Sequence, residues 1–137
     1  MALRTLGVVA LCVVVAFGSG WCVGASGRTS LALDLAQTGL RADVAEVRAS
    51  VLDARVSLTQ SNFGDARRAL QRASVIAERV QLRLRDVGQA DRASGVQTAI
   101  AHLAEADRLS GALDPGADAA AVLAVQALES SVPVIEP

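Results

Sequence analysis

The chain has 137 residues, a net charge of -1 and 52% hydrophobic residues, so it can form one small domain after a targeting segment. All of its basic residues are arginines, and the low net charge excludes a general electrostatic attraction to nucleic acid or anionic membranes. Aromatic residues make up only 2% of the chain, which argues against a sheet core and favours closely packed helices.

The first 27 residues have the pattern of a targeting segment. Leu6 to Ala25 is an uncharged run of about 20 residues, long enough to cross a bilayer as a helix. Arg4 precedes this run and favours an orientation with the N-terminus inside. We expect a signal anchor in a bacterial cytoplasmic membrane, a single pass with the C-terminal domain in the periplasm. The alternative is a signal peptide cleaved near Ala25, which would release the domain into the periplasm.

Small residues recur in this segment at Ala16, Gly20 and Gly24. Their spacing of four lets membrane helices approach closely, so they are candidates for helix packing within the membrane. Cys12 and Cys22 also lie here. The remainder of the chain therefore has no disulfide framework, thiolate metal site or cysteine nucleophile.

Residues 31–58 show the periodicity of a long helix. Apolar residues recur every seven positions in two interleaved rows: Leu33, Leu40, Val47 and Ala54, and Val44, Val51 and Leu58. Such rows form one apolar seam along a helix. The polar residues Thr59 to Asn62 compete for backbone hydrogen bonds and predict a turn.

A second helix is predicted at residues 63–87. Its apolar seam alternates steps of three and four: Phe63, Ala66, Leu70, Ala73, Ala77, Val80, Leu84 and Val87. Asn62 is the predicted N-cap, and Gly88 the predicted stop. Two seamed helices joined by a short turn predict an antiparallel helical hairpin.

Two shorter helices are predicted at residues 94–111 and 115–130, followed by a tail at 132–137. Ser94 and Gln97 have the spacing of a capping box, and Asp114 with Pro115 is a typical helix start. We therefore expect an all-α chain: an N-terminal transmembrane or signal helix, then the hairpin within a three- or four-helix bundle at residues 28–131. A dimeric coiled coil is the alternative, because such seams can also pair between chains.

Residues 61–73 resemble the second helix of a tetratricopeptide repeat, through Phe63, Ala66, Leu70 and Ala73. A similar pattern at 94–106 follows 33 residues later, close to the period of that family. The resemblance implies a peptide- or protein-binding module made of helical hairpins.

Catalytic chemistry has little support in the sequence. The one histidine, His102, lies beside the predicted seam of the third helix. No nucleophile elbow, Glu-x-x-His metal motif or phosphate-binding glycine loop accompanies it. We predict no catalytic, metal-binding or cofactor-binding residues, no nucleic-acid partner and no small-molecule substrate.

Arginines gather on the second predicted helix, and acidic residues dominate the last third of the chain. Arg68, Arg72, Arg79 and Arg83 form a candidate interaction face, either within the bundle or with another chain. We expect a non-catalytic envelope protein, anchored in the membrane, with a helical scaffold or interaction domain. Its expected partners are the membrane and either a second copy of the chain or another helical protein.

Overall fold

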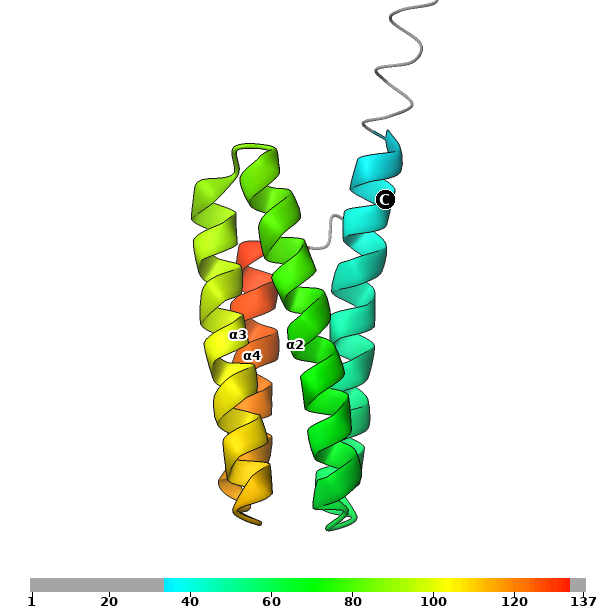
Figure 1. The fold of residues 1–137 in the computed structure, drawn as a ribbon, viewed down its shortest axis with the longest axis vertical. Helices are drawn as coiled ribbons and strands as arrows, with labels where there is room; N and C mark the ends of the chain where they lie inside the picture. Colours follow the sequence, from blue (N-terminus) through cyan, green and yellow to red (C-terminus); the bar gives the residue numbers. More distant parts are fainter. Residues whose placement is uncertain (1–33, 134–137) are drawn as a thin grey trace, which may run out of the picture. The chain divides into compact units, whose positions relative to one another are not determined.

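The computed structural model describes residues 34–133, and no strand occurs among them. Helices occupy residues 34–59 (called the first helix below), Phe63–Asp86 (α2), Ala90–Gly111 (α3) and Gly116–Ser131 (α4) (Figure 1). The described part of the chain is therefore all-α, as the sequence predicts. The expected membrane segment at residues 1–27 lies outside the described residues.

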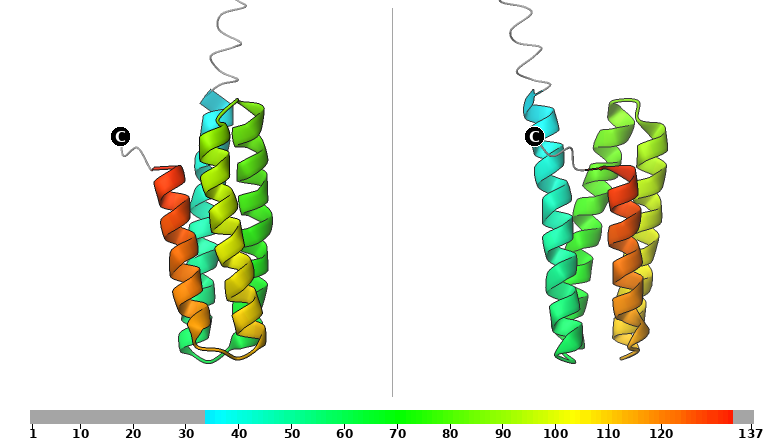
Figure 2. Two further views of the ribbon diagram at one scale, coloured as in Figure 1. Left: turned by 90° about the vertical axis from the view of Figure 1, so that its left-hand side faces the viewer. Right: turned by 180° about the vertical axis from the view of Figure 1, so that it is seen from behind.

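Residues 39–137 form one compact unit, and in its described part successive helices run in opposite directions (Figures 1 and 2). Ion pairs join the first helix to α2 and to α4, and α3 packs against both α2 and α4. The helices thus close into an antiparallel four-helix bundle, with the predicted hairpin as its first half.

The limits of α2 agree with the sequence signals. Asn62 accepts a hydrogen bond from the backbone N–H of Asp65, and Arg83 lies in the last turn. Gly88 follows the helix with φ +75°, the left-handed conformation that glycine adopts without strain. The helix is continuous over 24 residues. It is therefore one long helix, unlike the short helices that the tetratricopeptide resemblance implies.

The third helix begins at Ala90, four residues before the predicted start at Ser94. No side chain caps it, so the predicted capping box of Ser94 and Gln97 is wrong. Gln97 instead accepts a hydrogen bond from Gln81 of α2, at 2.6 Å. The extra turn is stabilised by burial, because Ala93 is only 1% exposed.

All three connections end the preceding helix in the same way. A residue with positive φ follows each helix, at Ser61, Gly88 and Leu113. The next N–H then reaches back across the last turn, from Asn62 to Ser57 O, from Gln89 to Leu84 O and from Asp114 to Leu109 O. This is the Schellman arrangement, which satisfies carbonyl groups that a helix end leaves free.

The core consists of small aliphatic side chains arranged around a few leucines. Leu70, Leu84, Leu103 and Leu128 are among its largest fully buried side chains, and most of the remaining core residues are alanine or valine. The predicted α2 seam is buried from Ala66 to Leu84. Its two ends differ from the prediction, because Phe63 is half-buried and Val87 is 61% exposed.

α3 and α4 lie very close together at Gly95. A Cβ atom added there would lie 2.8 Å from Ser131 Cβ and still closer to Ser131 Oγ. No real Cβ atom tolerates such a contact, so a methyl group at position 95 would push the end of α4 away from α3.

We predict that Gly95→Ala lowers the free energy of unfolding by about 1–3 kcal/mol, because overpacking outweighs the better helix propensity of alanine. The matched control is Gly64→Ala in α2, where the nearest atom to an added Cβ would be 3.9 Å away. That variant should be more stable than the wild type by up to about 1 kcal/mol. Thermal unfolding of the full chain, followed by circular dichroism, measures both. A stabilised Gly95→Ala protein would contradict the observed packing.

A second stability prediction concerns Ser61, an exposed residue held at φ 58°. Left-handed backbone is strained for residues other than glycine. Ser61→Gly should therefore raise the free energy of unfolding by about 0.5–1 kcal/mol. Gln60→Gly, one residue earlier, should lower it, since that substitution adds chain entropy without relieving strain. Equal effects of the two variants would show that residue 61 is not strained.

Candidate interaction surfaces

The predicted arginine face of α2 is divided in the structure. Arg79 and Arg83 both turn to Asp43 of the first helix: Arg83 Nη1 lies 2.9 Å from Asp43 Oδ2, and Arg79 Nη1 lies 3.6 Å from Asp43 Oδ1. The Asp43 side chain is only 10% exposed, whereas both arginines are about half exposed. These arginines therefore join two helices of the bundle.

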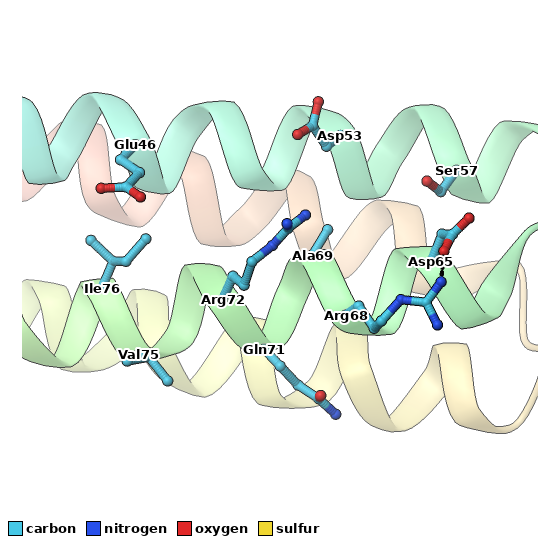
Figure 3. A pocket seen from close by; sticks show the side chains of 10 residues that line it. All are labelled: Glu46, Asp53, Ser57, Asp65, Arg68, Ala69, Gln71, Arg72, Val75 and Ile76. Atoms are coloured by element: carbon cyan, nitrogen blue, oxygen red, sulfur yellow. Dashed lines mark hydrogen bonds and ion pairs between the residues drawn. The ribbon is translucent and has the colours of Figure 1, made fainter.

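Arg68 and Arg72 lie on a different part of α2, along an open groove beside the first helix (Figure 3). Arg68 forms an ion pair with Asp65 of its own helix. Arg72 extends toward the first helix on the side of Asp53 (Figure 3), and no ion pair involves it among the described residues. The predicted face is thus two separate clusters.

The groove has a volume of about 730 Å³. Its walls come from the first helix and α2: Glu46, Asp53, Ser57, Asp65, Arg68, Ala69, Gln71, Arg72, Val75 and Ile76. Small-molecule sites are enclosed and mostly apolar, with a few placed polar groups. This groove is wide open to solvent, and most of its lining residues are charged or polar, so it fits a solvated surface better than an enclosed ligand pocket.

Acidic residues of the last two helices pair with arginines elsewhere in the bundle. Arg55 Nε lies 2.7 Å from Asp118 Oδ1 of α4, and Arg48 Nε lies 3.5 Å from Glu129 Oε1. The hydrogen bond to Asp118, with the charge of that carboxylate, raises the pKa of Arg55. The acidic α4 therefore faces the first helix, rather than the arginine-rich α2.

One titratable pair lies on the surface of α3. Arg108 donates hydrogen bonds to both carboxylate oxygens of Glu105, and these bonds lower the pKa of Glu105. A lowered pKa in the folded state stabilises the fold above the ordinary range of glutamate. That contribution is lost as the pH falls through the lowered pKa.

The first helix carries a second apolar seam that the sequence analysis does not single out. Ala42, Ala45, Ala49, Leu52 and Val56 follow steps of three and four, and all are exposed. Leu52 is 56% exposed and Val56 is 55% exposed. We call this set the outer stripe. The spacing of these apolar residues could have predicted the outer stripe. It was not predicted because the inner seam alone was sufficient to place the helix in a bundle.

The predicted inner seam of the first helix is buried in its middle part, with Val44, Val47, Val51 and Ala54 at most 3% exposed. Leu40 and Leu58 of that seam are half-buried, and Leu33 lies outside the described residues. The outer stripe runs along the opposite side of the helix, because its positions are about half a turn from the inner ones. It therefore contributes nothing to the core of the bundle.

Other predicted features stay outside these surfaces. His102 is half-buried on α3, and residues 34–133 contain no group of three potential metal ligands. None of the helices described here is both long and apolar enough to span a membrane. Ala16, Gly20 and Gly24 lie outside the described residues.

Comparison with known proteins gives no family assignment: no family model, curated protein or solved structure matches the chain.

We predict that Asp43→Asn lowers the free energy of unfolding by about 1–2 kcal/mol, because it removes the mostly buried partner of two arginines. The control is Glu78→Gln, which neutralises an exposed α2 carboxylate with no ion pair among the described residues. That change should stay within about 0.5 kcal/mol. Urea unfolding of the full chain at low and high salt measures both. Equal stability of the two variants would contradict a stabilising role for the Asp43 contacts.

Proposed function

We propose that the protein is a non-catalytic, membrane-anchored envelope protein, whose helical bundle is a scaffold or interaction domain. The observation that supports this most strongly is the outer stripe. Single apolar side chains are common on protein surfaces. A row of them at steps of three and four on one helix is instead typical of a surface that packs against another helix.

The rest of the bundle supports a binding role over catalysis. Many of its charged side chains form ion pairs across helices, such as Arg55 with Asp118 and Arg67 with Asp107. These contacts fix neighbouring helices relative to one another. A rigid bundle with an apolar stripe on one outer helix is suited to presenting that stripe to a partner.

The placement in the envelope rests on the sequence of the first 27 residues. The uncharged run from Leu6 to Ala25 has the length of a membrane span, and Arg4 favours a cytoplasmic N-terminus. In this proposal the anchor holds the bundle outside the cytoplasmic membrane. Cleavage near Ala25 would give a soluble periplasmic domain with the same outer stripe.

The proposal is tested by placing a photo-reactive amino acid at Leu52 in the full chain, produced in a bacterial host. We expect covalent adducts from position 52 in the membrane fraction, identified by mass spectrometry. The matched control places the same group at Thr98, an exposed polar residue of α3. Adducts from both positions in equal yield, or from neither, would contradict a specific interaction surface on the first helix.

A further inference from the structure

The outer stripe has the layout of a coiled-coil seam. In heptad terms Ala42, Ala49 and Val56 occupy a positions, and Ala45 and Leu52 occupy d positions. Valine at a and leucine at d favour two-stranded coiled coils. Alanine at the other positions lets the two helix axes approach closely.

Charged residues flank this seam with opposite signs on its two sides. The positions before each a residue, called g, hold Arg41, Arg48 and Arg55. The positions after each d residue, called e, hold Glu46 and Asp53. One edge of the stripe is therefore basic along its length, and the other is acidic.

This separation of charge favours pairing with an identical helix, and it favours a parallel over an antiparallel orientation. In a parallel pair of identical helices, each g residue faces the e residue five positions later in the other chain. Arg41 would meet Glu46 of the second copy, and Arg48 would meet Asp53 of the second copy. An antiparallel pair would instead place arginine against arginine and carboxylate against carboxylate, which is repulsive.

We propose that a second copy of this chain binds the outer stripe, and that the two first helices form a parallel two-stranded coiled coil. The inference rests on the proposed function and names its partner. The pair between Arg41 and Glu46 is the clearest contributor, because both side chains are exposed and neither has an ion pair within the described chain. Arg48 and Arg55 already contact α4, but a guanidinium has several donors and can serve two carboxylates.

The stripe is short, about two heptads or 21 Å from position 42 to position 56. Coiled coils of this length are weak on their own. Anchoring both chains in one membrane would raise their effective concentration. A parallel pair also brings residue 39 of both chains to the same end of the coiled coil, as two anchors in one membrane require.

Disulfide trapping tests the parallel arrangement in membranes that contain the full chain. The background variant carries Cys12→Ser and Cys22→Ser, so that only the introduced cysteine can react. In a parallel pair equivalent a positions face each other, so Ala42→Cys and Val56→Cys should each form a dimer with itself under mild oxidation. Thr98→Cys on α3 is the control and should stay monomeric. An antiparallel pair would instead place a positions against d positions, so Leu52→Cys is made as well. Dimers formed only when the Ala42→Cys and Leu52→Cys chains are mixed would overturn the parallel arrangement.

A charge exchange tests the specific contact. Glu46→Arg places arginine opposite Arg41 of the second copy and should raise the dissociation constant of the full chain in detergent about tenfold. The double variant Arg41→Glu with Glu46→Arg restores opposite charges and should return the dissociation constant to the wild-type value. Both positions are exposed, so the bundle should stay folded in each variant. A double variant as weak as the single one would contradict the proposed pairing.

These results separate the inference from the proposed function. If position 52 forms adducts only with other proteins while the cysteine variants stay monomeric, the interaction surface stands and the second copy is excluded as its partner. If position 52 also forms no adducts, both proposals fail.

Discussion

Close packing of small side chains is the constraint on which the bundle depends. The inner faces of the helices carry mostly alanine and valine, with single leucines filling the space between them. Small side chains bring helix axes together, and the resulting contacts leave little freedom at particular positions. The clearest example is Gly95, where the end of α4 lies so near α3 that only a hydrogen fits opposite Ser131. Ion pairs across the outside, such as Arg83 with Asp43, then fix neighbouring helices against each other.

The first helix carries apolar residues in regular rows on two opposite faces. One face supplies Val44, Val47 and Val51 to the core, and the other presents the outer stripe. A helix that only had to complete a bundle would need one apolar face, with polar residues on the other. The proposed role as an interaction domain follows from the second apolar face, which the bundle itself does not need. The opposite charges along the two edges of the stripe then favour a second copy over an unrelated helix, because one sequence supplies both halves of the pairing.

Periodicity predicted the helices well, since burial of a long seam is a local property of the sequence. It correctly placed the buried part of the α2 seam, from Ala66 to Leu84, and the stop at Gly88. It could not foresee contacts between helices. Gln97 has the right spacing for a capping box, yet it binds Gln81 across the helix interface. Leu113, rather than a nearby glycine, adopts the left-handed turn after α3.

The arginines of α2 share one stretch of sequence, but the position of Asp43 on the facing helix separates Arg79 and Arg83 from Arg68 and Arg72. The spacing of apolar residues in the sequence contains the outer stripe. Only the exposure of these residues in the structure shows that they do not belong to the core.

The most direct test of the interaction surface compares side chains that are equally exposed in a single chain. Leu52 of the outer stripe and Leu82 of α2 are both 56% exposed, so they form a matched pair. Hydroxyl-radical labelling of the full chain in its membrane, read by mass spectrometry, reports how much solvent each side chain meets. Occupation of the outer stripe predicts much weaker labelling of Leu52 than of Leu82, and equal labelling after denaturation. Equal labelling in the native membrane would contradict an occupied outer stripe and, with it, the proposed function.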